Sequence, residues 1–268
     1  MTPARSWLAA ALLLLASQTG AGDLVRVAII IDDLGNQLQS GRRAIGLHGD
    51  VAFAFLPGTP LAASLARRAY RDGKEVLLHL PLQADAGEPS TDPVGIRLDM
   101  SRVAVGEAFE RALQSVPHVI GINSHRGSLL TQHPGHMQWL MDEIKARDNL
   151  FFIDSYTTHK SVALRIAAET RVTAAKRDVF LDPDPAPETV AREFERMKRL
   201  ARKRGSVIAI GHPYAATLSL LERELPRLAE SGIELVPVSE LVGLSAGAGL
   251  VREETREKTI EPPELAAL

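Results

Sequence analysis

Cysteine is absent from this 268-residue chain. Its absence excludes thiolate catalysis, disulfide bonds and cysteine-ligated zinc, so any bound metal must use His, Asp or Glu ligands. A basic surplus is lacking as well, because the formal net charge is -2, and aromatic residues make up only 4% of the chain. Without a basic face or an aromatic stacking surface, we do not expect a nucleic-acid partner.

A glycine-rich turn is also missing where a nucleotide-binding fold would need one. The first apolar run leads into IDDLGN at residues 31–36, which contains a single glycine, Gly35. Neither the dinucleotide fingerprint nor the phosphate-binding loop fits one glycine, so we expect no nucleotide cofactor. What the chain does have, 45% hydrophobic and 24% charged residues, suits a globular protein with a sizeable core. Its length allows one large domain or two small ones.

The N-terminal residues have the three parts of a secretory signal. Arg5 supplies a positive charge, residues 8–16 form the apolar run LAAALLLLA, and small residues follow up to Ala21. We therefore predict a signal peptide at residues 1–21 and export, with the bacterial periplasm as the expected location. The apolar run is shorter than the ~20 residues of a permanent span, so only this segment is expected to contact the membrane. An uncleaved anchor is the alternative.

Residues 22–244 form the predicted folded domain, in which short apolar runs alternate with helical segments. Runs rich in Val, Ile and Phe predict buried parallel strands near residues 25–31, 51–57, 75–81, 119–123, 150–155, 172–175, 206–212 and 233–238. Apolar residues at three- and four-residue spacing predict helices over 64–70, 104–114, 137–146 and 188–204. This alternation indicates an α/β fold with one parallel sheet, either open and doubly wound or closed into a barrel.

Two segments depart from the alternation. Residues 84–98, ADAGEPSTDPVGIRL, predict a long loop over the end of the third strand, and loops of this length are often functional. Residues 245–268 are rich in small, charged and proline residues and predict a flexible C-terminal tail.

Polar residues gather at the carboxyl ends of the predicted strands, where parallel α/β folds form their sites. In chain order they are Asp32, Asp33, His79, Asn123, Ser124, His125, Asp154, Ser155, Arg177, Asp178, Asp182 and His212. One histidine at a strand end is usually a hydrogen-bonded core residue, but three of them opposite two carboxylates indicate a site. We interpret the remaining histidines as solvated or structural, namely His48, His118, His133, His136 and His159.

These residue types suit metal-assisted hydrolysis. Neutral imidazoles and a carboxylate can bind a divalent ion that lowers the pKa of water, and a second carboxylate can then take the proton. Adjacent Asp residues fit this division, because neighbouring side chains of a strand point in different directions. One alternative is that both Asp residues cap a helix around residues 34–45. Another is a metal-dependent phosphoesterase, but such an enzyme would need more Lys or Arg side chains at the strand ends than Arg126 and Arg177.

Six segments carry a resemblance to a known family. They are IIIDDLG (29–35), LLHLPLQ (77–83), GINSHRGS (121–128), FFIDSYTT (151–158), RDVFLD (177–182) and AIGHP (209–213). In this order they resemble the divergent polysaccharide deacetylase family, a branch of the polysaccharide deacetylase superfamily, over residues 25–242. The resemblance implies a distorted (β/α) barrel of about seven to eight parallel strands. It also implies metal-dependent removal of acetyl groups from sugars, with zinc as the common metal.

The resemblance further implies roles for single residues. The implied catalytic residues are Asp32, as base, and His212, as acid, and the implied metal ligands are Asp33, His79 and His125. Ordinary superfamily members have two ligand histidines four residues apart after the third strand. Here Gln83 follows His79 at that spacing, so His125 from the next strand is the replacement. The Arg-x-Pro-Tyr signature of ordinary members is also missing.

The expected activity is that of an exported hydrolase acting on an acetylated polysaccharide or a peptidoglycan-like cell-wall glycan. The predicted substrate contacts are Asn123, Arg126, Asp154, Arg177 and Asp182. A catalytically silent member of the same fold, serving as a glycan-binding or scaffolding module, is the alternative. The enzyme and the silent member differ in whether the site at the carboxyl ends of the strands holds a metal that activates water.

Overall fold

The strands and helices are taken from a computed structural model that describes residues 25–85 and 94–243. The strands are β1 (Val25–Leu34), β2 (Val51–Phe55), β3 (Val76–Leu82), β4 (Val119–Arg126), β5 (Phe151–Asp154), β6 (Ala174–Lys176), β7 (Val179–Phe180), β8 (Ser206–Gly211) and β9 (Ile233–Leu235). The helices are α1 (Leu38–Ile45), α2 (Ala62–Arg71), α3 (Arg102–Ser115), α4 (Pro134–Lys145), α5 (Ala163–Thr170), α6 (Pro187–Arg204) and α7 (Ala215–Glu224). Two short 3-10 segments, η1 (Leu130–Gln132) and η2 (Leu225–Ser231), also form, and residues 238–243 at the end of the described chain are helical.

The elements match the predicted alternation closely. All eight predicted strands form, and so do the four predicted helices. Strand β7 and helices α5 and α7 were not predicted, and β7, with only two residues, is too short to show a repeated apolar spacing. The predicted signal peptide, the predicted tail and the middle of the predicted loop at 84–98 lie outside the described residues.

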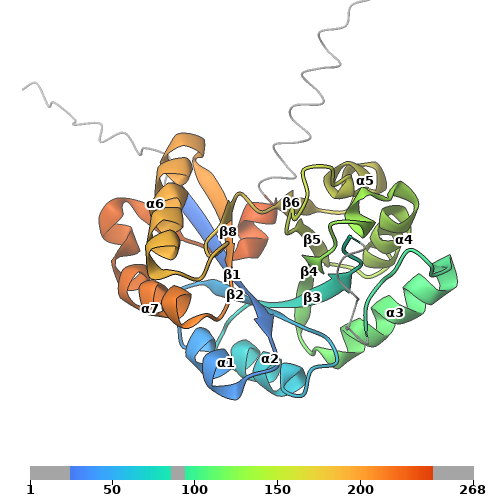
Figure 1. Cartoon of the computed structure of the whole chain (residues 1–268), viewed down its shortest axis with the longest axis horizontal. Helices are drawn as coiled ribbons and strands as arrows, with labels where there is room; N and C mark the ends of the chain where they lie inside the picture. The colour runs from blue at the N-terminus through green and yellow to red at the C-terminus, as the bar shows by residue number, and fades with distance from the viewer. Residues whose placement is uncertain (1–24, 86–93, 244–268) are drawn as a thin grey trace, which may run out of the picture.

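Every strand pairing among the described residues is parallel, and the strand order is β6-β5-β4-β3-β2-β1-β8-β7. Strand β9 pairs with the first three residues of β1, ahead of the point where β2 begins to pair with β1. Figure 1 shows β1 near the centre of the view, with α6 and α7 to its left and α3, α4 and α5 to its right.

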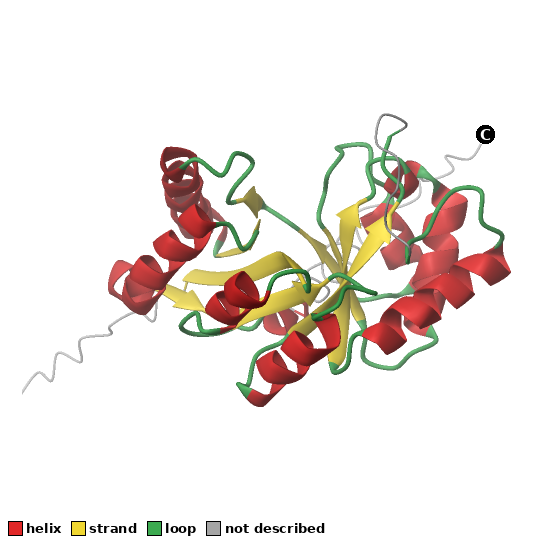
Figure 2. Cartoon of the chain, turned by 60° about the horizontal axis from the view of Figure 1, so that its bottom comes forward, coloured by secondary structure: helices red, strands yellow, loops and turns green. Residues whose placement is uncertain are grey.

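The sheet curves until its two edges nearly meet. Strands β6 and β7 stand at opposite ends of the strand order, yet only Arg177 and Asp178 separate them in the chain. Two residues span less than about 11 Å, so the edges lie close together without pairing. Helices surround the strands on the outside, as Figure 2 shows. This is the distorted (β/α) barrel that the family resemblance implies, and it decides against the open, doubly wound sheet.

Two buried clusters cover the two faces of the sheet. The larger contains helix residues and alternate strand residues, such as Val27, Ile29 and Ile31 of β1. The smaller contains the alternate strand residues, such as Ala28 and Ile30 of β1, together with residues of the helical segment 238–243. Successive strand residues point to opposite faces, so β1 has an outer row toward the helices and an inner row toward the barrel interior. The inner row is the one that leads to the site.

Among the described residues, every helix is too short or too polar to cross a bilayer.

Candidate metal and catalytic site

The inner rows of four strands end in polar side chains. In β1, Asp32 follows Ala28 and Ile30 at two-residue spacing, and in β3 His79 follows Leu77 in the same way. In β8 the inner row passes Ile208 and Ile210 and reaches His212 just after the strand. In β4, Asn123 and His125 share one row, and Asn123 pairs directly with His79 in the register. Because parallel strands end at the same rim, these side chains converge.

Asp33 belongs to the outer row by spacing but is turned toward the site. Its φ is +58°, in the left-handed region, and the register between β1 and β2 shifts across this point. Such a bulge redirects a side chain. His79 Nε2 consequently lies 3.6 Å from Asp32 Oδ2 and 3.2 Å from Asp33 Oδ1. Both carboxylates therefore face one imidazole, which corrects the prediction that strand alternation points them in different directions.

Gly35 makes this turn possible. Its φ is +127°, and a Cβ at that position would lie 2.0 Å from the Oγ1 of Thr59. A side chain is therefore excluded both by backbone conformation and by space. The lone glycine of IDDLGN shapes the carboxylate turn.

Asp33, His79 and His125 form a cluster whose possible ligand atoms all lie within 4.8 Å of one another. His125 Nδ1 is 3.0 Å from Asp33 Oδ1 and 3.0 Å from His79 Nε2. Asp33 Oδ1 is buried and has no well-aligned hydrogen bond. Two imidazole nitrogens and a carboxylate oxygen aimed at one point are a donor set that suits a divalent cation. The structure thus brings together the three residues that the resemblance implied as ligands.

The charges of the cluster are strongly coupled. Burial alone would raise the pKa of Asp33, but the rings of His125 and His79 outweigh it and hold that pKa far below its usual range. Burial would lower the pKa of His79, but Asp32 and Asp33 outweigh it and raise that pKa to about 9. Without a metal, a proton on His79 therefore supplies the positive charge that the carboxylates attract.

Asp32 lies deeper than Asp33 and is only 2% exposed. Asn123 Nδ2 donates a hydrogen bond of 2.7 Å to Asp32 Oδ1. Burial raises the pKa of this carboxyl above its ordinary value, although His79 and His212 partly oppose the shift. A raised pKa brings a carboxylate closer to the value that suits a general base near neutral pH.

His212 is held by a second buried carboxylate. Asp182 Oδ1 lies 2.9 Å from His212 Nδ1, and Asp182 Oδ2 accepts bonds from the His212 backbone N–H and the Thr217 hydroxyl, each at 2.7 Å. Burial would lower the pKa of His212, but the hydrogen bond to Asp182 and nearby carboxylates raise it. His212 Nε2 then faces the site, 3.7 Å from Asp33 Oδ2. This arrangement suits a histidine that carries a proton toward a reacting group.

The helix-cap alternative for the Asp pair is contradicted. Helix α1 begins at Leu38, its N-cap is Gln37, and no side chain caps it. No acidic residue lies in its first turn. Asp32 and Asp33 precede the helix and contact imidazoles instead.

The predicted substrate residues fall into two groups. Asn123, Asp154 and Asp182 are at most 3% exposed, and their side chains bind other protein groups. Asp154 lies in the outer row beside Phe152 and accepts bonds from the Ser161 hydroxyl and the Tyr156 N–H.

Arg126 and Arg177 are partly exposed near the rim. The guanidinium of Arg177 donates to the backbone carbonyls of Ser155 and Tyr156 and stacks over Phe180. Gln83, at the place of the missing second histidine, accepts a bond from the Leu98 N–H and so fastens the chain after the loop. Of the predicted substrate contacts, the two arginines are the ones at accessible positions.

Sequence reasoning overlooked Tyr214 and the recess beside it. The recess has a volume of about 200 Å³ and is lined by Asp33, Leu34, Gly35, Asn36, Gln37, Ser40, His212, Pro213 and Tyr214. Tyr214 is 44% exposed, and its ring centroid lies 5.4 Å from that of His212. Its position two residues after His212 in the AIGHP segment was the available signal.

Comparison with known proteins agrees with the fold and the motifs. The sequence model described as divergent polysaccharide deacetylase matches residues 29–242. The uncharacterized protein YibQ of Escherichia coli (strain K12) is 37% identical over 233 residues, which cover 87% of this chain and 71% of that protein. An uncharacterized protein of Haemophilus influenzae is 36% identical over 216 residues, which cover 81% and 76% of the two chains.

A crystal structure shows the same fold. It is that of uncharacterized protein ATU2773 from Agrobacterium tumefaciens C58, with a TM-score of 0.77 and 24% identity. The match covers 81% of this chain and 88% of that one. Because the family match spans most of the barrel and all the strand ends that form the site, the chain belongs to the divergent polysaccharide deacetylase family.

Proposed function

We propose that this protein is an exported, zinc-dependent deacetylase that removes acetyl groups from a cell-wall glycan. The observation that carries the proposal is the convergence of Asp33, His79 and His125 beside Asp32 and His212. Family membership supports an acetylated glycan as the substrate class. The recess next to the site, with amide, hydroxyl and aromatic groups, provides the kind of lining that suits a sugar ring.

The residues fit zinc better than magnesium or calcium. Two imidazole nitrogens and one carboxylate oxygen are borderline donors, whereas Mg²⁺ and Ca²⁺ prefer all-oxygen sites. Three protein ligands also leave a coordination position open, as in catalytic zinc sites. Bound there, zinc would polarise the acetyl carbonyl and lower the pKa of water.

The protein groups divide the proton transfers between them. Asp32 takes a proton from the attacking water, aided by a pKa that burial raises. His212 gives a proton from Nε2 to the leaving amine or hydroxyl of the sugar, while Asp182 holds Nδ1–H and the ring orientation. The water oxygen bonds to the acetyl carbon, the acetyl C–N or C–O bond breaks, and acetate and the free amine or hydroxyl of the sugar leave.

The test is zinc content together with acetate release. Purified protein without its predicted signal should bind one zinc ion per chain and release acetate from acetylated glycan fragments. His125→Ala should weaken zinc binding strongly, because one of three protein donors is lost. His118→Ala is the matched control, since His118 stacks on Tyr70 outside the cluster and should leave zinc binding unchanged.

The outcome separates the enzyme from its silent alternative. Zinc binding without acetate release from any tested glycan would support a glycan-binding module with an inert site. Absence of zinc binding by the parent would contradict the metal assignment itself.

Export is tested separately. The N-terminus of the protein recovered from the periplasm should begin near Gly22 if the signal at residues 1–21 is cleaved. Recovery of all the protein from the cytoplasm with Met1 or Thr2 at its end would contradict export.

A further inference from the structure

Asn123 joins the implied base to an implied metal ligand. Its Nδ2 donates to Asp32 Oδ1 at 2.7 Å, and its Oδ1 lies 2.9 Å from His79 Nδ1. The residue is fully buried, with 0% exposure. Both ends of its amide are engaged by residues of the site.

The chemistry of the three groups decides which atom carries each proton. A carboxylate only accepts hydrogen bonds, so the amide nitrogen must face Asp32. The amide oxygen then faces His79 and can only accept, so His79 Nδ1 must be protonated. In a neutral imidazole this leaves the lone pair on Nε2. Nε2 is the nitrogen that lies 3.2 Å from Asp33 Oδ1.

The barrel interior brings Asn123 within reach of Asp32. Asn123 is next to His79 across the β3–β4 pairing, whereas Asp32 lies on β1, two strands beyond β3. The strand between β1 and β3 is β2, whose inner residues are Ala52 and Ala54. These small side chains leave room for an amide to reach across the interior.

We propose that Asn123 is a positioning residue that couples metal binding to the catalytic base. It keeps His79 in the tautomer whose Nε2 can bind a metal, and it holds Asp32 so that Oδ2 faces the site. This inference rests on the proposed function. Ligand histidines commonly donate their second N–H to a supporting acceptor, and losing that acceptor typically weakens metal binding by about 10–100-fold.

An amide meets both requirements in a way that other buried side chains of this size do not. Leucine has the same number and branching of side-chain heavy atoms but would leave Asp32 and His79 without this partner. Aspartate keeps an acceptor for His79 but has no N–H for Asp32. A residue that only filled space would tolerate apolar Leu better than Asp, which places a second buried carboxylate beside Asp32. The positioning role predicts the opposite order for zinc affinity, so the pair of variants separates positioning from packing.

The experiment measures zinc affinity by chelator competition in Asn123→Leu, Asn123→Asp and the parent. Asn123→Leu should bind zinc about 10–100-fold more weakly, while Asn123→Asp should stay within about threefold of the parent. Ser124→Ala is the matched control. Ser124 is also buried on β4, but its hydroxyl accepts from the Ser155 N–H, so its loss should spare zinc affinity.

A second readout needs no variant. In the zinc-loaded parent, nitrogen-15 NMR of the histidine rings should show His79 protonated at Nδ1 and ligated through Nε2. Ligation through Nδ1, or an unprotonated Nδ1, would overturn the proposal even if Asn123→Leu failed to fold. Equal zinc affinities in all Asn123 variants would overturn it as well.

These readouts separate this inference from the proposed function. If the parent binds zinc but releases no acetate, the deacetylase proposal fails while the affinity and NMR tests of Asn123 still stand. If acetate is released and the Asn123 variants bind zinc like the parent, the positioning role fails alone. A parent that binds no zinc would overturn both.

Discussion

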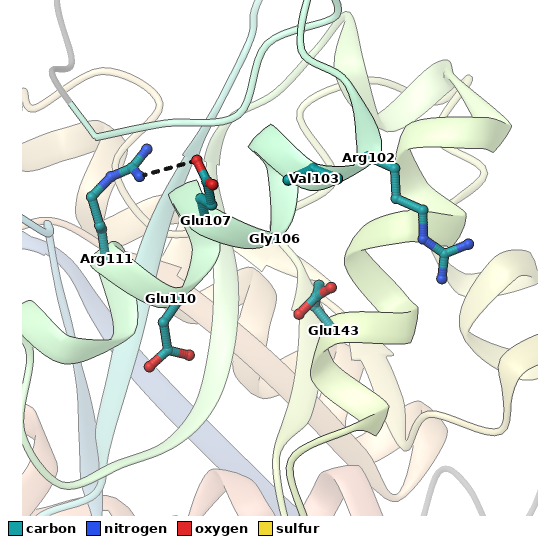
Figure 3. Close-up of a pocket in the computed structure, with 7 residues that line it drawn as sticks. All are labelled: Arg102, Val103, Gly106, Glu107, Glu110, Arg111 and Glu143. Atoms are coloured by element: carbon teal, nitrogen blue, oxygen red, sulfur yellow. Dashed lines mark ion pairs between the residues drawn. The ribbon is translucent and has the colours of Figure 1, made fainter.

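Two charged hollows of this molecule show how differently the same residue types behave. One is the site at the strand ends. The other, which we call the α3–α4 hollow, is lined by Arg102, Val103, Gly106, Glu107, Glu110, Arg111 and Glu143 (Figure 3). In Figure 3, Glu143 of α4 points toward α3, and Arg111 pairs with Glu107 on the same helix. Both hollows contain several carboxylates.

Burial and partner type separate the two. In the α3–α4 hollow, Glu107 and Arg111 are more than 60% exposed and pair at 3.8 Å, and Glu143 pairs with Arg147 at 3.0 Å. Arginine neutralises a carboxylate permanently and water screens the rest, so such pairs contribute little. In the site, buried carboxylates face imidazoles, which can lose a proton and bind a metal. A carboxylate can therefore take part in metal binding or proton transfer when it is buried and faces imidazoles, and not when it is exposed and paired with arginine.

The largest expected difference between the hollows is in metal binding. Asp33→Asn should reduce zinc affinity by more than about 100-fold, beyond the loss expected for a supporting residue, because a neutral amide gives up the charge attraction. Glu143→Gln in the α3–α4 hollow should leave it unchanged. Isothermal titration of both variants measures the contrast. Similar affinities in the two variants would remove the distinction between the hollows.

A second substitution sharpens the comparison inside the site itself. Asp32→Asn should keep zinc, because Asp32 is not in the ligand cluster, but should lower turnover by roughly 10²–10⁴-fold as expected for loss of a general base. Zinc content and acetate release are measured on the same sample. Loss of zinc together with activity would instead show that Asp32 is a ligand.

The pH dependence of stability should distinguish the metal-free and zinc-loaded forms. The pKa of His79 is raised from 6.5 to about 9 in the folded, metal-free protein. The folded state binds the His79 proton more tightly than the unfolded state does. This difference stabilises the fold fully below pH 6.5 and is lost as the pH rises toward 9. We expect urea unfolding of the metal-free protein to lose on the order of 2–3 kcal/mol over this window.

Zinc should flatten this pH dependence, because it replaces the proton on His79. Glu143→Gln should show the same curve as the parent in both forms. A metal-free protein whose stability does not change between pH 6.5 and 9 would contradict the coupling of His79 to the two carboxylates.

The smallest expected effect belongs to the α3–α4 hollow. Glu143→Gln breaks a partly exposed pair with Arg147 that spans one helical turn. It should cost only about 0.3–0.5 kcal/mol of unfolding free energy, and less in high salt. A loss of several kcal/mol in urea unfolding would show that the ion pairs of the α3–α4 hollow contribute much more to stability than exposed pairs do.

Much of the barrel could be read from the order of residues alone. The apolar runs that became β1, β3 and β8 are long enough to mark buried strands, and each ends at a polar residue. Two-residue spacing even places Asp32 and His79 in the inner rows, since Ala28, Ile30 and Leu77 precede them. The family resemblance added the implied roles of the ligand residues. Strand β7 could not be predicted, because two residues are too few to show an alternation of apolar and polar side chains.

What the chain alone determined is therefore the alternation of strands and helices, the polar strand ends and the family. Only the tertiary structure decided which of those polar ends share a site. The bulge at Asp33 turned an outer-row carboxylate inward, and the outer row kept Asp154 away. Asn123, predicted as a substrate contact, bonds to Asp32 inside the barrel. The two residues are 91 positions apart in sequence, so no local pattern predicts this bond. Sequence spacing records which face a side chain takes, whereas a distance across the barrel depends on the closure of the whole sheet.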